Sequence, residues 1–273
     1  MSKTWFITGA GRGIGAEIAR AALASGDKVV VTGRNLEQLS SAYAAHGDRV
    51  LCLALDVAQE RDTVVAAQAA VARFGGIDVL VNNAGYGQLG LFEEVASADV
   101  EQQFRTNVFG LMHVTRAILP TMRRQRRGHI LNLSSIGGFV GFQASSIYCA
   151  AKFAVEGFSE SLALEVARFN VKVTVVEPGF FRTDFLDKSS VRYGSQTVGD
   201  YADAGGASYE DYNHKQPGDP AKLGQVIVQL AGMDEPPLHF LAGSDAVACA
   251  TDAFKRRTQE VQRHAALSVT TDI

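Results

Sequence analysis

The stretch TWFITGAGRGIG, Thr4 to Gly15, decides the fold. Thr4 to Thr8 is a short apolar run typical of a buried strand, and a glycine-rich turn follows it at once. From Ile14 to Leu23 the apolar residues recur with helical spacing, and this pattern ends at Ser25-Gly26. Strand, glycine turn and helix in this order are typical of a dinucleotide-binding unit, in which backbone N–H groups at the helix start face a pyrophosphate.

The second predicted strand, Lys28 to Thr32, ends at Gly33-Arg34-Asn35. A unit that binds NAD normally carries Asp or Glu about 20 residues after the glycines, where the carboxylate holds the ribose 2′-hydroxyl. Here Arg34 stands at the strand end instead, and Arg12 lies inside the glycine turn. Two guanidinium groups near one ribose favour a 2′-phosphate, and therefore NADP(H). The alternative is a solvated surface arginine at each place.

The rest of the chain alternates between short apolar runs and segments with helical spacing, which predicts one α/β domain over residues 1–273. No repeat, low-complexity run or linker divides the chain. The further predicted strands are Val50–Leu55, Val79–Val81, Ile130–Leu133, Lys172–Val176 and Leu238–Leu241. The further predicted helices are Leu36–Ala45, Asp62–Phe74, Ala98–Arg124, Ile147–Ala167, Ala221–Ala231 and Asp245–His264.

One long stretch interrupts this alternation. From Asp187 to Pro220 the sequence is polar and rich in Gly, Tyr and Asp. A break of this length inside a compact domain is usually a lid or a binding loop. We therefore expect residues 187–220 to be the most mobile part of the free protein and to close over a bound substrate.

Tyr148 and Lys152 are four residues apart in a predicted helix, so they lie one above the other on one face. A phenol has a pKa near ~10 and needs a neighbouring cation before it exchanges protons near neutral pH, which Lys152 could supply. Ser135 follows a predicted strand, where open parallel sheets build their sites. Asn107 lies within the apolar stripe of a helix and needs a partner, structural or catalytic. The alternatives are a solvated helix face for Tyr148 and Lys152, and a loop-bonding serine.

Composition excludes several function classes. The net charge of -3 argues against a basic surface that binds nucleic acid. One basic cluster is present, and we interpret it as the C-terminus of a helix, where positive charge complements the helix dipole. It consists of Arg123, Arg124, Arg126 and Arg127. Three separated cysteines predict a reducing, intracellular compartment, and six scattered histidines predict no metal site. No signal-peptide pattern or membrane-spanning run is present, so we expect a cytoplasmic protein with no membrane partner.

These motifs together resemble the short-chain dehydrogenase/reductase family from about Thr4 to Ala242. Thr8-Gly9-x-x-x-Gly13-x-Gly15 matches its nucleotide motif, Asn82-Asn83-Ala84-Gly85 its NNAG segment, and Asp56 its adenine-contacting acid. Asn107, Ser135, Tyr148 and Lys152 match its catalytic tetrad, and Pro178-Gly179 with Thr183 matches the segment that meets the nicotinamide. The resemblance implies a doubly wound, mostly parallel seven-stranded sheet with helices on both faces. The cofactor-binding residues it implies are Gly9, Arg12, Gly13, Ile14, Gly15, Arg34, Asn35, Asp56, Val57, Asn83, Ala84, Gly85, Tyr148, Lys152, Pro178, Gly179, Phe181 and Thr183.

The end of the chain indicates which branch of the family the sequence resembles more. Pro236-Pro237, Gly243-Ser244-Asp245 and the long terminal helix are more similar to the branch grouped with 17β-hydroxysteroid dehydrogenases than to the ketoacyl reductases. A usual pairing surface of the family implies a homodimer through the helices Ala98–Arg124 and Ile147–Ala167. The terminal helix could block the further pairing that makes tetramers.

The implied reaction is reversible hydride transfer between NADP(H) and a carbonyl or secondary alcohol. Tyr148 would exchange the proton, Ser135 would orient the reacting oxygen, and Lys152 would lower the phenol pKa and hold the nicotinamide ribose. Asn107 would support a water that reconnects Lys152 to solvent. The rival hypotheses are an epimerase or dehydratase on the same scaffold, and a non-catalytic NADPH-sensing regulator. Aromatic residues suggest an apolar or aromatic substrate, with contacts expected from Ser135, Phe139, Phe142, Tyr148 and Phe185, and with Phe180, Phe181 and Tyr193 nearby.

Overall fold

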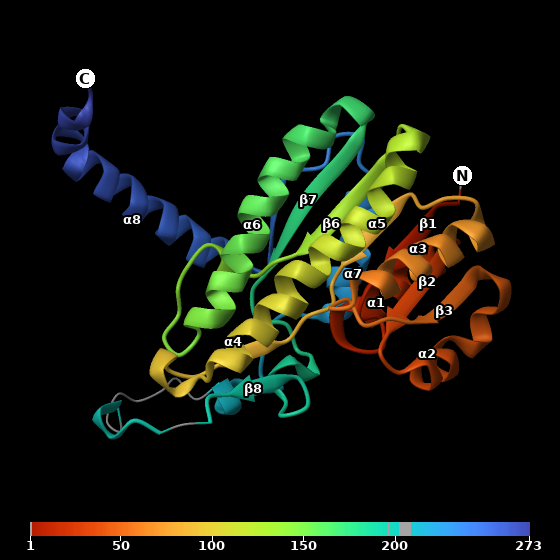
Figure 1. The fold of residues 1–273 in the computed structure, drawn as a ribbon, viewed down its shortest axis with the longest axis horizontal. Helices are drawn as coiled ribbons and strands as arrows, with labels where there is room; N and C mark the ends of the chain where they lie inside the picture. The colour runs from red at the N-terminus through yellow and green to blue at the C-terminus, as the bar shows by residue number, and fades with distance from the viewer. Residues whose placement is uncertain (1, 196, 202–208) are drawn as a thin grey trace.

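The computed structural model describes residues 2–195, 197–201 and 209–273. Seven parallel strands form one twisted sheet in the order β3-β2-β1-β4-β6-β7-β9 (Figure 1). The fold class predicted from the sequence is confirmed. The strands are β1 (Thr4–Ile7), β2 (Lys28–Gly33), β3 (Val50–Ala54), β4 (Val79–Asn82), β6 (Gly128–Leu133), β7 (Val171–Pro178) and β9 (His239–Ala242).

Helices cover both faces of the sheet, with α3, α5 and α6 in front of it and α1 and α7 behind it in Figure 1. The helices are α1 (Gly13–Ala24), α2 (Leu36–Tyr43), α3 (Glu60–Phe74), α4 (Ser97–Phe104), α5 (Gly110–Gln125), α6 (Ser146–Val166), α7 (Pro220–Gly232) and α8 (Ser244–Ser268). Short 3-10 turns cover Ala44–Arg49, Phe92–Glu94, Ile136–Gly138, Ala167–Phe169, Asp184–Leu186, Gly199–Tyr201, Tyr209–Tyr212 and Val269–Thr271.

Alternating side chains of each strand enter two separate cores. Trp5 and Ile7 of β1 pack in the core shared with α1, α2 and α7, where Ile18, Leu39 and Ile227 are buried. Phe6, between them, enters the core shared with α3, α5 and α6. Because both faces are covered, apolar residues occupy consecutive positions along the strands rather than every second one. This explains the continuous apolar runs that marked them in the sequence.

The direction in which successive strands are added to the sheet reverses between β1 and β4. The chain winds outward from β1 to β3 and then returns to place β4 on the other side of β1. At this point the Thr8 hydroxyl oxygen accepts the N–H groups of Asn83 and Ala84 at 2.9 and 3.0 Å. The Asn83 amide donates back to the carbonyl oxygens of Thr8 and Gly9 at 2.9 and 3.1 Å. Open α/β sheets bind ligands at such a switch point, and here hydrogen bonds hold its two sides together.

Two glycines allow the loop after β1 to come this close. Gly9 has φ 65°, and a Cβ there would lie 3.0 Å from the Ala84 Cα. At Gly15 a Cβ would overlap the Asn83 amide and the Gly9 carbonyl oxygen. Gly15 therefore packs behind the loop, where any side chain would push α1 away from β4.

Three elements depart from the predictions. The region predicted as one helix, Ala98–Arg124, contains α4 and α5 joined by a π-helical turn, Arg105–Phe109. The stretch predicted as a lid contains β8 (Val191–Tyr193), which pairs in parallel with β5 (Gly87–Leu89). The terminal helix α8 is longer than expected and projects from the body of the molecule (Figure 1). None of the helices in the described part of the chain is long and apolar enough to cross a membrane.

His129 makes the fold sensitive to acid. It is buried in β6, its Nε2 lies 2.9 Å from the Thr174 hydroxyl, and burial together with Lys172 and Lys3 lowers its pKa to about 3. Between about pH 6.5 and pH 3, His129 is therefore protonated in the unfolded chain but neutral in the folded chain. The free energy of unfolding falls as the pH drops through this range. We expect His129→Gln to lose this slope, which is about 1.4 kcal/mol per pH unit for one group. Urea unfolding at several pH values would measure it, with the exposed His264→Gln as control. Equal slopes in all three proteins would contradict the assignment.

The close approach at Gly15 can be tested against a second glycine. Gly15→Ala should lower the free energy of unfolding by about 1–3 kcal/mol, because the new methyl group overlaps Asn83 and Gly9. Gly157, exposed in α6 with open space around it, is the matched control. Gly157→Ala should raise the free energy of unfolding by about 0.5–1 kcal/mol, through helix propensity. Urea unfolding of both variants measures the difference, and a neutral Gly15→Ala would show that the loop can move away.

Candidate active site

A cavity of about 710 Å³ opens at the carboxyl ends of the strands, beside the switch point between β1 and β4. Most of the residues predicted for the site line it, although they come from every part of the chain. They are Gly9, Arg12, Gly13, Ile14, Arg34, Asn35, Asp56, Val57, Asn83, Ala84, Gly85, Asn107, Ser135, Phe142, Tyr148, Lys152, Pro178, Gly179, Phe181, Thr183 and Phe185.

Two predicted site residues lie elsewhere. Gly15 does not line the cavity, since it packs on Asn83 behind the glycine turn. Phe139 does not line it either, because the 3-10 turn Ile136–Gly138 carries residue 139 against α8. Its ring stacks edge-on with Phe254, with 5.5 Å between ring centroids, and with His239 at 5.9 Å. The prediction that Phe139 contacts substrate is therefore wrong for this structure.

Ser135, Tyr148 and Lys152 meet at one wall of the cavity. Ser135 follows β6, and its hydroxyl oxygen accepts the Gly137 N–H at 3.0 Å, which fixes the side chain at the start of the 3-10 turn. Tyr148 lies in the first turn of α6, and Lys152 follows one turn later with its Nζ 5.7 Å from the centre of the phenol ring. The Lys152 ammonium is buried and donates to the Leu133 carbonyl oxygen at 2.8 Å. The Ser135 hydroxyl, the Tyr148 phenol and the Lys152 ammonium thus lie together at this wall of the cavity.

The pKa values of this group differ from the sequence prediction. Burial raises the pKa of Tyr148 to about 12, and its hydrogen bond with Ser135 offsets only part of that rise. The net shift is therefore upward, and the lowering of the phenol pKa expected from Lys152 stays a prediction. Burial also lowers the pKa of Lys152 to about 8, although Glu156 acts in the opposite direction. With this pKa, Lys152 still carries its proton for the most part at neutral pH.

Asn107 lies in the π-helical turn between α4 and α5. Its amide donates to the Tyr86 carbonyl oxygen at 2.9 Å, and its carbonyl accepts the Tyr86 N–H at 3.2 Å. The extra residue of a π turn directs one side chain out of the helical stripe, and such turns are frequent at functional sites. The partner that the sequence required for Asn107 is therefore the backbone that follows the NNAG segment.

The opposite end of the cavity carries the residues predicted for the adenosine side. Arg12 donates to the hydroxyl and carbonyl oxygens of Ser189 at 2.9 and 3.0 Å, so its guanidinium group bridges the cavity mouth. Arg34 is exposed, with no hydrogen bond or ion pair assigned to it among the described residues. Asn35 caps α2 by accepting the Gln38 N–H at 3.0 Å, and Asp56 accepts the Ala58 N–H at 3.0 Å. The link from Arg12 to Ser189 was not predicted, because the two residues are far apart in sequence.

The segment after β7 is held against α8. The Phe180 N–H donates to an Asp245 carboxylate oxygen at 2.7 Å, and a Cβ on Gly179 would overlap the same carboxylate. Thr183 then caps the 3-10 turn Asp184–Leu186 by accepting the Phe185 N–H at 3.3 Å. Sequence reasoning missed Asp245, whose one local signal is its place at the start of α8 after Gly243.

Aromatic and apolar side chains surround the remaining part of the cavity. The Phe185 ring lies 5.8 Å from the Tyr148 ring, and Phe142, Leu186 and Val191 lie nearby in the lining. Tyr193, which the sequence placed near the substrate, lines a separate small pocket beside Leu89. Of the predicted lid, Lys188 to Arg192, Tyr209 and Gln216 line the cavity, while residues 196 and 202–208 lie outside the described residues. The predicted mobility of the lid stays a prediction.

The glycine turn fits a pyrophosphate. Gly9 and Gly13 have φ values of 65° and 58°, which L side chains rarely adopt, and the cavity reaches both. At the start of α1, Arg12 makes no side-chain capping hydrogen bond, and the first turn contains no acidic residue. The first N–H groups of α1 are thus free of side-chain caps, as an anion-binding helix terminus requires. The residues present therefore fit a dinucleotide.

Known proteins share this arrangement. Residues 3–193 match the family model described as short chain dehydrogenase. The chain is 41 % identical to Oxidoreductase BOA17 of Botryotinia fuckeliana (strain B05.10), over 90 % of this chain and 91 % of the relative. It is 36 % identical to the 3-ketodihydrosphingosine reductase of Bacteroides thetaiotaomicron, over 87 % of this chain and 86 % of the relative.

Solved structures agree in fold. A short-chain dehydrogenase from Streptomyces avermitilis superposes with a TM-score of 0.92 and 39 % identity, covering 100 % of both chains. ElxO with NADP bound has a TM-score of 0.75 and 29 % identity, covering 89 % of this chain and 97 % of its own. A Burkholderia phymatum family member in complex with NAD has a TM-score of 0.83 at 24 % identity, covering 96 % and 95 %, and shows the fold alone. With the family model, the close relatives and the shared fold in agreement, this chain belongs to the short-chain dehydrogenase/reductase family of oxidoreductases.

Proposed function

We propose that this chain interconverts a carbonyl compound and a secondary alcohol, with Tyr148 as the group that exchanges the proton. The observation that carries the proposal is the meeting of Ser135, Tyr148 and Lys152 at one wall of the cavity. The nicotinamide supplies or accepts the hydride when the cofactor is bound. The protein residues then have to hold the reacting oxygen and move one proton.

The pKa of Tyr148 supports a role as proton donor. With a pKa near about 12, the phenol is protonated throughout the physiological range and can give its proton to an alkoxide that forms beside it. Ser135, hydrogen-bonded to the phenol, is placed to donate to the same oxygen. Lys152, held by the Leu133 carbonyl oxygen, keeps a mostly protonated amine 5.7 Å from the centre of the phenol ring. In this proposal Asn107 fixes the Tyr86 backbone beside the NNAG segment.

We propose an apolar ketone as the substrate. Beyond Tyr148 the lining includes the apolar residues Leu89, Phe142, Phe185, Leu186 and Val191, while Asp184, Lys188 and Arg192 bring charged groups to the same cavity. A relative over most of the chain is named for reduction of 3-ketodihydrosphingosine, a ketone with a long apolar chain.

We propose NADP(H) as the preferred cofactor. The end of β2 carries Gly33 and Arg34 where an NAD-binding unit normally carries an acid. Arg34 lines the cavity and is free to bind a 2′-phosphate, whereas Arg12 would first have to exchange its contacts with Ser189. Arg34 therefore carries most of the proposed preference.

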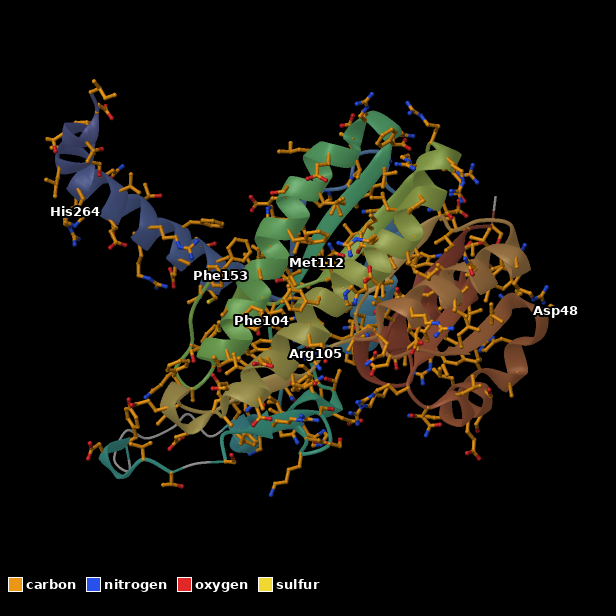
Figure 2. The ribbon with its side chains drawn as sticks, in the orientation of Figure 1. Asp48, Phe104, Arg105, Met112, Phe153 and His264 are labelled. Carbon is orange, nitrogen blue, oxygen red and sulfur yellow. The ribbon has the colours of Figure 1, made fainter. Side chains whose placement is uncertain are left out.

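We also propose a homodimer through the outer faces of α4, α5 and α6. Figure 2 shows Phe104, Met112 and Phe153 on the side of these helices that faces away from the sheet. Phe109, Phe153 and Leu164 are 50 %, 39 % and 84 % exposed, so these helices present large apolar side chains to solvent. An isologous contact between two copies would cover this surface.

The proton-transfer role is tested by Tyr148→Phe. The substitution removes the phenolic hydroxyl and keeps the ring, so cofactor affinity should change less than about 3-fold while kcat falls by about 10²–10⁴-fold. Stopped-flow reduction of a panel of apolar ketones and titration of cofactor fluorescence measure the two quantities. The matched control is Tyr212→Phe, an exposed tyrosine outside the cavity lining. A variant that retained wild-type rates would show that another group donates the proton.

Cofactor preference is tested by exchanging the end of β2. We expect the wild type to prefer NADPH over NADH by about 10–1,000-fold in kcat/KM, and added salt to reduce the ratio because Arg34 is exposed. Gly33→Asp combined with Arg34→Leu should shift the ratio toward NADH, since it restores a ribose acceptor and removes the guanidinium group. Arg61→Leu, an exposed arginine on α3, controls for the loss of one charge. A wild type that prefers NADH would refute the proposal.

A further inference from the structure

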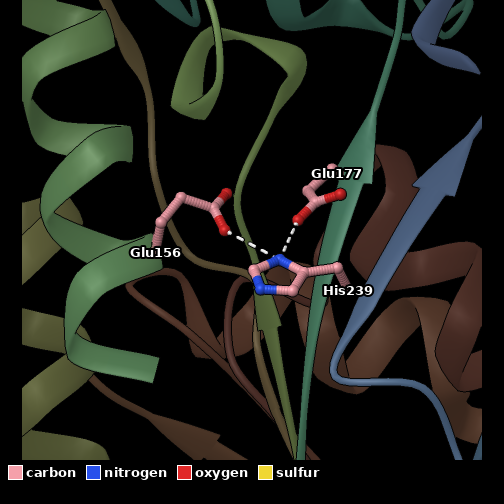
Figure 3. A group of neighbouring side chains, drawn as sticks. All are labelled: Glu156, Glu177 and His239. Atoms are coloured by element: carbon pink, nitrogen blue, oxygen red, sulfur yellow. Dashed lines mark hydrogen bonds and ion pairs between the residues drawn. The ribbon is translucent and has the colours of Figure 1, made fainter. Parts of the chain in front are cut away.

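Three side chains from three elements meet beside the catalytic wall, outside the cavity. They are Glu156 of α6, Glu177 of β7 and His239 of β9, and Figure 3 shows them converging. The His239 Nδ1 lies 2.7 Å from a Glu177 oxygen and 3.5 Å from a Glu156 oxygen. One donor atom from each residue lies within 4.8 Å of the other two. None of the three lines the cavity, so the proposed reaction does not account for them.

Apart from the Glu177 Oε1 atom, which His239 Nδ1 contacts, the carboxylate oxygens of this buried pair have no hydrogen-bond donor among the described residues. Glu177 is 0 % exposed and Glu156 is 7 % exposed. Both oxygens of Glu156 and the Oε2 atom of Glu177 are buried without a hydrogen-bond partner among the described residues. Burial raises the pKa of the Glu156 carboxyl to about 8, and the Ser134 hydroxyl beside it acts in the opposite direction. Buried carboxylate oxygens without donors require a proton or a cation to offset the loss of water.

His239 alone does not supply enough positive charge. Its Nε2 faces a Glu160 oxygen at 3.3 Å, so three carboxylates surround one imidazole ring. With Glu156 and Glu177 both ionised, even a protonated ring would leave two negative charges, and burial accordingly raises the pKa of Glu177 to about 7. A divalent cation would neutralise Glu156 and Glu177 together while His239 remained a neutral ligand.

The surroundings match those of metal ligands in proteins. A metal-binding histidine almost always donates its second ring N–H to a carboxylate or carbonyl, which orients the first nitrogen. Glu160 stands at that place for His239 Nε2. The Phe139 ring packs edge-on against the imidazole and closes one side of the group. The His239 side chain is 33 % exposed and Glu160 is 56 % exposed, so an ion can enter from solvent on that side.

We propose that Glu156, Glu177 and His239 bind one divalent transition-metal ion of the Zn²⁺ class, with Glu160 orienting the histidine. Two carboxylate oxygens and an imidazole nitrogen form a ligand set that zinc uses in proteins, whereas Ca²⁺ and Mg²⁺ prefer oxygen alone. The ion would join α6, which carries Tyr148 and Lys152, to β7, which leads into Pro178-Gly179. Its role is to fix these elements relative to one another. The proposal departs from the sequence prediction of no metal site, and it does not depend on the proposed reaction.

The experiment uses the full chain after treatment with a chelator, followed by equilibrium dialysis against Zn²⁺ and elemental analysis. We expect one Zn²⁺ per chain, with a thermal unfolding midpoint that rises on binding. Glu177→Gln and His239→Gln should each weaken binding by at least ~100-fold, and Glu160→Gln by about 10-fold. Asp187→Asn is the matched control, because Asp184, Asp187 and His214 form a second, more exposed group with similar donor atoms. This control should bind Zn²⁺ as the wild type does.

Several outcomes would overturn the proposal. They are a stripped wild type that takes up no Zn²⁺ at low micromolar concentration, binding that survives both Glu177→Gln and His239→Gln, and binding lost in Asp187→Asn. Circular dichroism checks that each variant folds. If Glu177→Gln does not fold, anomalous diffraction at the zinc edge on wild-type crystals decides the question. A peak between the three residues supports the site, and a peak elsewhere or none rejects it.

Discussion

The hydrogen bonds between Thr8 and the start of the NNAG segment are the constraint on which the site depends. One hydroxyl oxygen accepts two backbone N–H groups from the end of β4, and the Asn83 amide returns two hydrogen bonds to the end of β1. This exchange requires the glycine turn to lie against Ala84, which only residues without a Cβ allow at Gly9 and Gly15. The distance between the ends of β1 and β4 is therefore fixed, and with it the shape of this side of the cavity.

Buried polar side chains extend this constraint to the catalytic wall. The Asn82 amide donates to Asn132 and to the Thr115 hydroxyl, both at 2.9 Å, and the Asn132 amide donates to Ser159 of α6 at 2.8 Å. A hydrogen bond of this kind adds only about 0.5–1.5 kcal/mol net, but a buried donor left without a partner costs about 1–3 kcal/mol. The network thus penalises any shift of α6 relative to β4 and β6. Tyr148 and Lys152 are held in place by contacts that lie outside the cavity.

The sequence predicted those features that arise from local patterns. Strand, glycine turn and helix follow each other within Thr4–Ala24, and Tyr148 and Lys152 are one helical turn apart, so spacing alone located them. Contacts between distant segments were not predictable in this way. The Arg12–Ser189 bridge and the β5–β8 pair depend on a loop whose path no periodicity records. Phe139 failed as a predicted substrate contact, because a three-residue 3-10 turn decides the direction of its ring.

The loop that follows Phe181 leaves and rejoins the domain at one place. Phe181 and Gly218 form a bridge, in which the Arg182 N–H donates to the Gly218 carbonyl oxygen and the Gly218 N–H donates to that of Phe180, both at 2.9 Å. An insertion closed at its base in this way can change in length and composition at little entropic cost to the sheet. The segment between residues 181 and 218 can therefore be replaced as one unit during evolution. A graft between residues 181 and 218 would replace Thr183 and Phe185 as well, so it would exchange predicted cofactor and substrate contacts in a single step.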